Sequence, residues 1–218
     1  MSFGAESSYE ASIQARSRLS SAAFEISLSR PPDFHFVPGQ CIRLFQDQGG
    51  RDYSLSSGPA ENCLRIVLRL VEGGAASSRL ATAPLGQRLR FSGPHGYFLF
   101  QASPRQAIFV ATGAGVAPFL SMVESGVRDF SLLHGVRSED ELYYRAKLRD
   151  SARRYLPCLS QGGGEGCFPG RVTKWARRFL EPGSHDFYLC GSRAMIRDMT
   201  LLADEAFPGS RVFTEAFH

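Results

Sequence analysis

Four consecutive residues in the first half of the chain combine a cation, an aromatic ring and a hydroxyl. They are Arg51, Asp52, Tyr53 and Ser54, and they follow a Gln-Gly-Gly turn. In an extended strand Arg51 and Tyr53 share one face, and Asp52 and Ser54 share the other. A guanidinium fork suits a phosphate, a tyrosine ring offers a stacking surface, and a serine hydroxyl can pair with a ring nitrogen. The stretch therefore suits a ligand with a flat ring and a phosphate; an edge strand with half-exposed side chains is the alternative.

A second stretch with the chemistry of phosphate binding lies in the other half of the chain. Residues 106–111 are nearly all apolar, as in a strand buried on both faces. They run into Thr112, Gly113 and Gly115, and a helix is expected at residues 119–125. A glycine-rich turn from strand to helix is where a parallel α/β sheet binds a phosphate group. This spacing predicts a nucleotide site, with a purely structural turn as the alternative.

The composition bounds the class of protein. The chain has 218 residues, of which 43% are hydrophobic and 21% charged, so it is expected to form one large or two small globular domains. It has no apolar run long enough for a membrane span and no signal pattern at its start, so we expect a cytoplasmic protein. The five cysteines are scattered without a CxxC pair, which argues against a disulfide framework and predicts no metal site or iron–sulfur cluster. A net charge of +4 without a basic stripe does not favour nucleic acid.

Short strands are expected throughout the first half. They lie at residues 9–17, 22–29, 41–45, 64–71 and 86–91. Their regular spacing, with turns between them, predicts a small antiparallel barrel. In the strand at 64–71, apolar and basic residues alternate.

The pattern changes near residue 101. Strands are expected at residues 106–111, 130–137, 155–160, 186–192 and 211–218, with helices at 119–125, 139–148 and 175–179 and after residue 192. Strands that alternate with helices predict a parallel α/β sheet. We therefore expect two domains, at residues 1–100 and 101–218.

The motifs and their order resemble those of the ferredoxin–NAD(P)H reductase superfamily over nearly the whole chain, in a branch without a fused iron–sulfur domain. Arg-x-Tyr-Ser resembles the flavin signature of that family, and residues 38–40 and 93–98 resemble the turns before and after it. By resemblance, Arg51 contacts a flavin phosphate, Tyr53 packs on the isoalloxazine ring and Ser54 bonds near its reactive nitrogen. The resemblance implies an antiparallel β-barrel that holds FAD, followed by a Rossmann-like NAD(P)-binding α/β domain.

A segment of small residues after the strand at 64–71 resembles the family's Gly-x-x-Ser segment, where backbone and serine hold the flavin pyrophosphate. The positions carried over are Gly74, Ala75, Ala76 and Ser77. Ser77 is also expected to cap a helix whose free N–H groups favour an anion, although an ordinary capped junction is the alternative. A pyrophosphate site implies FAD rather than FMN. The residues expected beside the ribityl chain are Val67, Leu68 and Arg69.

The second half resembles the nicotinamide nucleotide domain of the family. The loop positions carried over are Thr112, Gly113, Gly115 and Pro118. Arg137 stands at the carboxyl end of a strand, where a parallel sheet receives ligands. Ser160 is followed by Gln161, where NADPH-using relatives have an arginine that grips the 2′-phosphate. Because Arg171 could still meet that phosphate, the choice between NADH and NADPH stays open, and Arg193 is expected near the adenosine half.

Four residues are catalytic candidates by resemblance. They are Ser54, Cys190, Glu215 and Phe217. Cys190 is expected with Gly191 beside the nicotinamide, Glu215 near the reacting atoms, and Phe217 over the flavin until nicotinamide displaces it. Hydride transfer needs orientation more than acid–base groups. The alternatives are a small buried thiol and a frayed terminal strand. His95 is expected in a surface turn and His134 as a packed strand residue.

The function that the resemblance implies is hydride transfer from NAD(P)H to FAD, with electrons then passed singly to a ferredoxin or flavodoxin. Such carriers are typically acidic, and arginines on the surface are expected to steer one. The arginines in question are Arg145, Arg149, Arg153 and Arg154. Two rival functions are a flavin reductase that uses flavin as a substrate and a non-catalytic electron-relay subunit. Relay subunits of this superfamily carry a C-terminal cysteine cluster, which the chain lacks.

Overall fold

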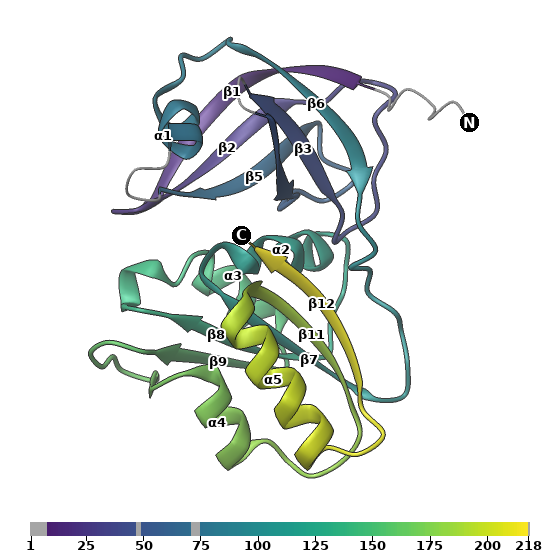
Figure 1. Ribbon diagram of the computed structural model, residues 1–218, viewed down its shortest axis with the longest axis vertical. Helices are drawn as coiled ribbons and strands as arrows, with labels where there is room; N and C mark the ends of the chain where they lie inside the picture. Colours follow the sequence, from purple (N-terminus) through teal and green to yellow (C-terminus); the bar gives the residue numbers. More distant parts are fainter. Residues whose placement is uncertain (1–7, 47–48, 71–74, 218) are drawn as a thin grey trace.

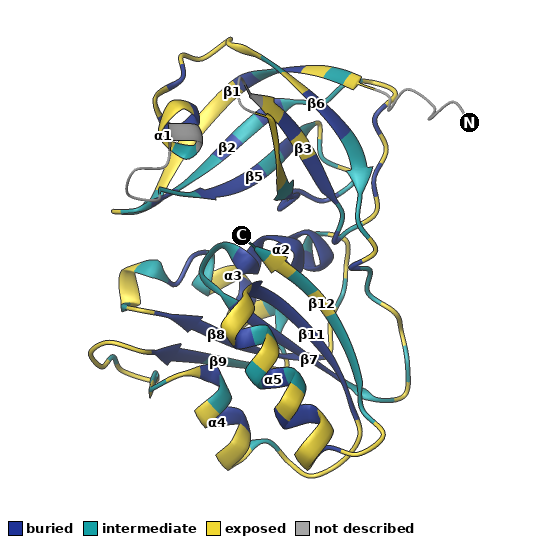
Figure 2. Ribbon diagram, viewed as in Figure 1, coloured by how far each residue is buried: buried dark blue, intermediate teal, exposed yellow. Residues whose placement is uncertain are grey.

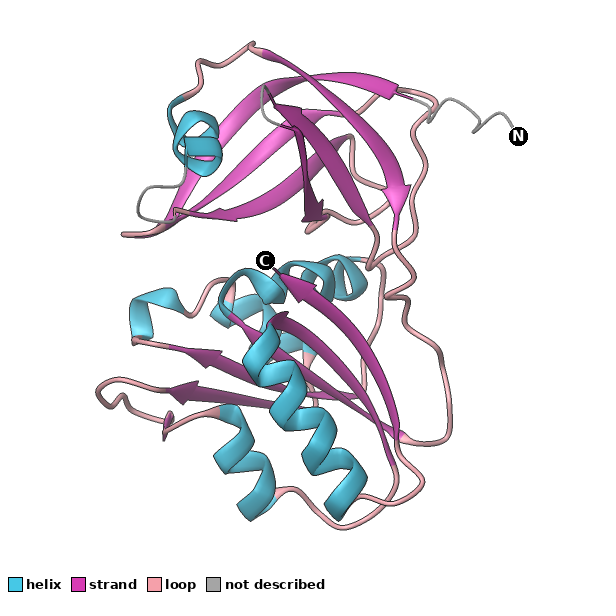
Figure 3. Ribbon diagram, viewed as in Figure 1, coloured by secondary structure: helices cyan, strands magenta, loops and turns pink. Residues whose placement is uncertain are grey.

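Two lobes, each built on a six-stranded sheet, make up the computed structural model, which describes residues 8–46, 49–70 and 75–217 (Figure 1). The antiparallel sheet comes first along the chain and the parallel sheet second, so the predicted fold class is confirmed. Figure 3 shows strands dominating the first lobe and helices flanking the sheet of the second. The domain boundary near residue 100 stays a prediction. In the described part of the chain, every helix is too short or too polar to cross a bilayer.

The first lobe is an antiparallel barrel. Its strands are β1 (Ser8–Ser20), β2 (Ala23–Ser29), β3 (Cys41–Gln46), β4 (Gly49–Ser54), β5 (Cys63–Arg69) and β6 (Arg88–His95). They pair in the order β4-β3-β6-β1-β2-β5, and a bridge between Leu55 and Ile66 joins the two ends of the sheet. On β5 the even-numbered residues Leu64, Ile66 and Leu68 fill the core, because alternate side chains point to opposite faces.

The second lobe is a parallel sheet covered by helices on both faces. Its strands are β7 (Gln106–Thr112), β8 (Phe130–Val136), β9 (Arg154–Leu159), β10 (Phe168–Pro169), β11 (His185–Ser192) and β12 (Arg211–Phe217), in the order β10-β9-β8-β7-β11-β12. The helices are α2 (Ala117–Glu124), α3 (Arg145–Ser151), α4 (Val172–Phe179) and α5 (Arg193–Ala206). Every residue of β8 is buried, as the apolar run predicts for a covered parallel strand.

The predicted helix at residues 139–148 is wrong as a single element. The chain forms a short 3₁₀ helix, η2 (Glu139–Glu141), and then α3. Tyr144 separates them with a left-handed backbone, at φ 58°. Its hydroxyl donates to Glu25 of the barrel over 2.6 Å, so a contact between the lobes prevails over local helix propensity.

Of three smaller expectations, those for Ser77 and His95 are wrong and that for His134 is confirmed. Helix α1 (Ala75–Thr82) begins two residues before Ser77, so Ser77 lies in its first turn and does not cap it. His95 ends strand β6, with its Nε2 2.9 Å from the Ser92 hydroxyl, and so lies in a strand, only partly exposed. His134 is fully buried with its Nδ1 2.9 Å from the Tyr155 hydroxyl, which confirms a packed strand residue. Burial lowers the pKa of His134 to about 3.

Helix α2 lies where the two lobes meet (Figure 1). All of its residues from Ala117 to Val123 are buried, which Figure 2 shows as a dark helix between the lobes. One side packs on the parallel sheet through Phe119. The other side faces the barrel, where the Ser121 hydroxyl donates to the carbonyl oxygen of Ser57 over 2.6 Å. Its position between two partners explains why this helix is buried on all sides and mostly apolar.

Candidate functional site

Three predicted residues from both lobes meet at the carboxyl ends of their strands. Ser54 ends β4 in the barrel, whereas Cys190 and Glu215 are paired neighbours on β11 and β12. The Ser54 hydroxyl donates to Oε2 of Glu215 over 2.9 Å, although the two residues are 161 positions apart in the chain. The thiol of Cys190 lies 3.9 Å from the same oxygen. The structure therefore gathers a hydroxyl, a carboxyl and a thiol between the lobes.

Burial sets the protonation of this cluster. It raises the pKa of Glu215 to about 7, although the hydrogen bonds from Ser54 and Cys190 act in the opposite direction. Burial and the neighbouring Glu215 hold the pKa of the Cys190 thiol well above its usual value. Glu215 can therefore hold or release a proton near neutral pH, whereas Cys190 stays a neutral thiol. This thiol is unsuited to nucleophilic attack, which needs a thiolate.

A second cysteine of this cluster was not predicted. Cys41 is paired with Ser54 across strands β3 and β4, so both side chains lie on one face. Burial, and next the charge of Glu215, raise the pKa of Cys41 to about 12. The sequence signal was a cysteine directly after the turn at residues 38–40, but only the register of the hairpin reveals its neighbour.

Strand β4 presents the residues expected to hold a flavin. Its pairing with β3 puts Arg51 and Tyr53 on one face, and Asp52 and Ser54 on the other, as the alternation predicts. The Nε and Nη2 atoms of Arg43 each donate a hydrogen bond of 2.7 Å to one carboxylate oxygen of Asp52. Arg51 is exposed, and Tyr53 is half-buried against the barrel core. An exposed cation, a partly open ring and a hydroxyl thus follow one another along an edge strand, which fits a phosphate-bearing flavin.

The segment expected to hold the pyrophosphate is only partly described. Gly74 lies outside the described residues, while Ala75, Ala76 and Ser77 form the first turn of α1, which contains no acidic residue. On the preceding β5, Val67 and Leu68 are buried, and the Leu68 side chain belongs to the barrel core. Arg69 forms an ion pair of 3.7 Å with Glu141 of the second lobe. The part these residues play toward a ribityl chain or pyrophosphate stays a prediction.

The predicted nucleotide loop interlocks with the Cys-Gly segment. Its residues from Gly113 to Val116 form the 3₁₀ helix η1 (Gly113–Val116) between β7 and α2, with Pro118 in the first turn of α2. A Cβ on Gly115 would collide with the carbonyl oxygen of Cys190, so only glycine lets the loop approach β11. The Thr112 hydroxyl accepts a hydrogen bond of 2.9 Å from the backbone N–H of Ser192, the residue after Gly191.

The space above this loop is open. A Cβ on Gly113, whose φ is +54°, would meet nothing within 4 Å. Backbone without a side chain, next to open space at the carboxyl edge of a parallel sheet, fits a ligand phosphate.

The remaining nucleotide candidates lie along the same edge of the parallel sheet. Arg137 follows β8, Ser160 follows β9, Arg171 directly precedes α4, and Arg193 is the first residue of α5 after β11. The carboxyl ends of parallel strands share one edge, so residues far apart in the chain come together here. Arg137, Ser160, Arg171 and Arg193 are all exposed. Phe217, paired with Ser192 at the end of β12, packs against the core of the second lobe and is half-buried.

The four arginines expected to steer a carrier do not form one patch. Arg153 and Arg154 lie at the start of β9, at the edge of the sheet opposite the cluster around Glu215. Arg145 is paired with Glu139, Arg149 with Asp150 and Arg153 with Asp129. Their positive charge is therefore partly offset and is spread over two edges.

Two domain families match the chain. Residues 11–100 match the oxidoreductase FAD-binding domain, and residues 109–200 match the oxidoreductase NAD-binding domain. The first range covers the barrel lobe and the start of the connection to the second lobe, and the second range lies within the α/β lobe. In addition, no group of three or more potential metal ligands is found among the described residues.

Individual relatives cover most of the chain. Ferredoxin–NADP reductase B of Sorangium cellulosum is 36% identical over 86% of this chain and 88% of its own length. Methane monooxygenase component C of Methylosinus trichosporium is 33% identical over 81% of this chain, which spans 58% of that protein. Among solved structures, a ferredoxin NADP⁺ reductase from Neisseria gonorrhoeae with bound FAD and NADP has a TM-score of 0.84 at 24% identity. The match covers 96% of this chain and 98% of that one.

Proposed function

Since the chain belongs to the family of ferredoxin–NADP reductases and is an FAD-dependent oxidoreductase of NAD(P)H, we propose that a ferredoxin or a flavodoxin takes up its electrons. The observation that carries the proposed reaction between the coenzyme and the flavin is the meeting of Ser54, Glu215 and Cys190 between the lobes. A reaction between two bound ligands requires groups from both binding sites around one point. The ferredoxin named for the Sorangium cellulosum relative supports this kind of acceptor.

The barrel lobe is proposed to hold FAD. Arg51 binds a phosphate, Tyr53 stacks on the ring system and the Ser54 hydroxyl forms a hydrogen bond near the reactive ring nitrogen. Bound FAD supplies the chemistry that side chains lack, because it accepts a hydride and releases electrons one at a time. The residues proposed around the pyrophosphate and the ribityl chain are Gly74, Ala75, Ala76, Ser77, Val67, Leu68 and Arg69.

The α/β lobe is proposed to hold the coenzyme so that its nicotinamide lies over the flavin. The loop around Gly113 and Gly115 receives the phosphates, and the neutral thiol of Cys190 packs beside the nicotinamide. Phe217 covers the flavin face until the coenzyme arrives. Glu215 holds a proton at its carboxyl near pH 7 and orients the Ser54 hydroxyl. These residues act by orientation and by excluding water, which is what hydride transfer needs.

The FAD site can be tested through Arg51. In Arg51→Met the phosphate loses a charge-assisted partner, so FAD should bind about tenfold or more weakly, with the fold unchanged. Quenching of flavin fluorescence on titration into apoprotein measures the Kd. The matched control is Arg88→Met, because Arg88 is an exposed barrel arginine paired with Glu10. Equal Kd values for Arg51→Met and the control would exclude Arg51 from the site.

The preferred coenzyme can be read from anaerobic bleaching of the flavin by NADH and by NADPH. We propose that Arg137 and Arg171 supply charge for a 2′-phosphate in place of the arginine that Gln161 replaces. Arg171→Gln should then weaken NADPH binding several-fold and leave NADH binding unchanged. Equal loss for both coenzymes would assign Arg171 to a part of the ligand that they share.

Electrostatic steering of the acceptor predicts a dependence on salt. The rate of electron transfer to an added acidic ferredoxin should fall as ionic strength rises from 0.01 to 0.2 M, because screening shortens the reach of surface charges. A rate that is independent of salt would contradict steering. The quadruple variant of Arg145, Arg149, Arg153 and Arg154 to glutamine then tests whether these arginines supply the attraction.

The two rival functions give different results. If flavin is a substrate, dialysis should remove the yellow colour, whereas a bound cofactor stays. If the chain is a non-catalytic relay, neither NADH nor NADPH should bleach the flavin. A cytoplasmic location is part of our proposal and is supported by five free cysteines, which a reducing compartment maintains.

A further inference from the structure

The outward face of β5 meets the second lobe through three alternate residues. Leu64, Ile66 and Leu68 point into the barrel core, so Arg65, Val67 and Arg69 point out of it. Arg65 reaches Glu124 at the end of α2, and Arg69 reaches Glu141. Val67, buried between them, lies on the strand that contacts the nucleotide loop η1.

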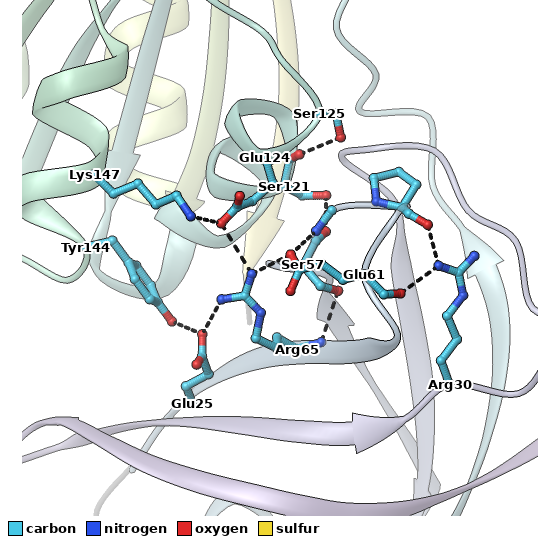
Figure 4. Close-up of polar contacts among 12 residues, drawn as sticks. Glu25, Arg30, Ser57, Glu61, Arg65, Ser121, Glu124, Ser125, Tyr144 and Lys147 are labelled. Atoms are coloured by element: carbon cyan, nitrogen blue, oxygen red, sulfur yellow. Dashed lines mark hydrogen bonds and ion pairs between the residues drawn. The ribbon is translucent and has the colours of Figure 1, made fainter.

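Arg65 is bound by three carboxylates (Figure 4). Its guanidinium lies 2.6 Å from Glu61 and 3.4 Å from Glu25, which both belong to the barrel. It lies 3.4 Å from Glu124, which belongs to the α/β lobe. The side chains of Arg65 and Glu124 are only 17% and 19% exposed, so salt screens this pair weakly.

The surroundings hold these charges in place. Lys147 of α3 pairs with Glu124, and the Tyr144 hydroxyl donates to Glu25 over 2.6 Å (Figure 4). A Cβ on Gly58 would lie 2.9 Å from the Cβ of Glu124, so the barrel turn presses directly on the end of α2.

Removing the Arg65 charge would leave carboxylates of opposite lobes facing one another. Glu25 and Glu61 would stand on the barrel side and Glu124 on the side of α2, and like charges gathered around one position repel. Lys147 pairs with Glu124 from the same lobe, but its side chain is 50% exposed, so it offsets the charge of Glu124 only in part. The lobes would therefore move apart at the end of α2, whose other end carries the nucleotide loop.

We propose that Arg65 is a positioning residue that sets the angle between the lobes and thereby the overlap of nicotinamide and flavin. Its guanidinium forms ion pairs with Glu25, Glu61 and Glu124, which are not among the residues proposed to hold either ligand, and it acts through α2, which it ties to the barrel. Because α2 begins at the nucleotide loop, a shift of its far end displaces the coenzyme relative to a flavin on β4. This inference rests on the proposed meeting of the two ligands between the lobes.

The decisive experiment compares Arg65→Met, Arg65→Lys and the double variant Arg65→Met/Glu124→Gln, all purified with FAD. In Arg65→Met the limiting rate of flavin bleaching at saturating coenzyme should fall about tenfold or more, because small misplacements of reacting atoms are costly. The long-wavelength absorbance of stacked nicotinamide and flavin should weaken, and small-angle scattering should show a larger radius of gyration. FAD content should stay unchanged.

The other variants separate positioning from a role in folding alone. The double variant should recover part of the bleaching rate and compactness, because it removes the carboxylate that Arg65→Met leaves facing the barrel. Arg65→Lys keeps the charge without the fork and should lie between wild type and Arg65→Met. Arg88→Met is the control and should match wild type.

Two results would overturn the inference. One is an Arg65→Met protein with the limiting rate, stacking absorbance and radius of the wild type. The other is a double variant no better than Arg65→Met, which would make Arg65 a structural residue only. If the wild type itself is not bleached by NADH or NADPH, the proposed function fails, and the scattering comparison still tests the lobe angle.

Discussion

At the scale of residues, burial determines the chemistry of the site, because it shifts the pKa values of the side chains that meet there. The carboxyl of Glu215 is shielded between two lobes, where it contacts the hydroxyl of Ser54 and the thiol of Cys190. Shielding raises its pKa to about 7, so a group that is ionised in water becomes a proton carrier at neutral pH. Cys190 and Cys41 are shielded in the same way and stay neutral.

The raised pKa of Glu215 predicts how stability depends on pH. Folded protein keeps the proton up to about pH 7, whereas the unfolded chain loses it near pH 4.5, so stability falls as pH rises through this window. Glu215→Gln removes the ionisation. Its apparent Tm relative to wild type should therefore rise between pH 5 and pH 8, by about 2–4 °C for each kcal/mol.

Circular dichroism melts of both proteins at pH 5 and pH 8 measure this change. Glu205→Gln, at an exposed carboxylate, is the matched control and should show no such trend. A difference between Glu215→Gln and wild type that is the same at both pH values would contradict the raised pKa.

At the scale of elements, the strand-to-helix loops are shaped by one another. The loop after β7 fits against the end of β11 because Gly115 has no side chain to strike the Cys190 carbonyl. The Thr112 hydroxyl then ties the two loops together. A contact with a distant segment also shapes the chain at Tyr144. There the hydrogen bond from the Tyr144 hydroxyl to Glu25 accompanies a left-handed residue that interrupts the helix.

The contact at Gly115 predicts a sharp difference between two glycines. Gly115→Ala should destabilise the protein by about 1–3 kcal/mol through overpacking, and it should also weaken coenzyme binding. Gly163→Ala should be nearly neutral, because a Cβ there meets nothing within 4 Å. Urea unfolding and coenzyme titration measure both effects. Equal behaviour of the two variants would show that the loop has room to shift.

At the scale of the whole molecule, the two lobes are held by buried polar contacts as well as by apolar packing. Ser121 of α2 donates to the Ser57 carbonyl, and Arg65 joins the same helix to β5. These contacts lie on the barrel side of α2, whose other side packs on the parallel sheet. Rigidity between lobes is needed because the reaction joins two ligands held on separate sheets.

The buried hydrogen bond from Ser121 to the Ser57 carbonyl predicts that losing the Ser121 hydroxyl lowers stability more than losing the hydroxyl of Ser125. Ser121→Ala leaves the Ser57 carbonyl without its donor and should destabilise the protein by about 1–3 kcal/mol. Ser125→Ala is the control, because the Ser125 hydroxyl bonds to the Ser121 carbonyl within its own turn. Denaturant unfolding followed by flavin fluorescence compares them. A loss in Ser125→Ala as large as in Ser121→Ala would argue against an interlobe contribution.

The sequence by itself determined the class of each half and the positions of the predicted binding loops. Alternating apolar residues on short strands are typical of a half-buried antiparallel sheet, and an apolar run before a glycine turn and a helix is typical of a parallel sheet. Such signals are local, so they can be read from neighbours along the chain. The Arg-x-Tyr-Ser strand and the loop at Gly113 were found in this way.

Only the tertiary structure decided which residues meet across the lobes. The proximity of Ser54 to Glu215, the place of Cys41 and the carboxylates around Arg65 depend on hairpin register and on how α2 packs between two sheets. The alternating basic residues of β5 were visible in the sequence, but not their partners. Partial burial by distant segments raises the pKa of Glu215, and no local pattern records it, because segments far apart in the chain together shield the carboxyl.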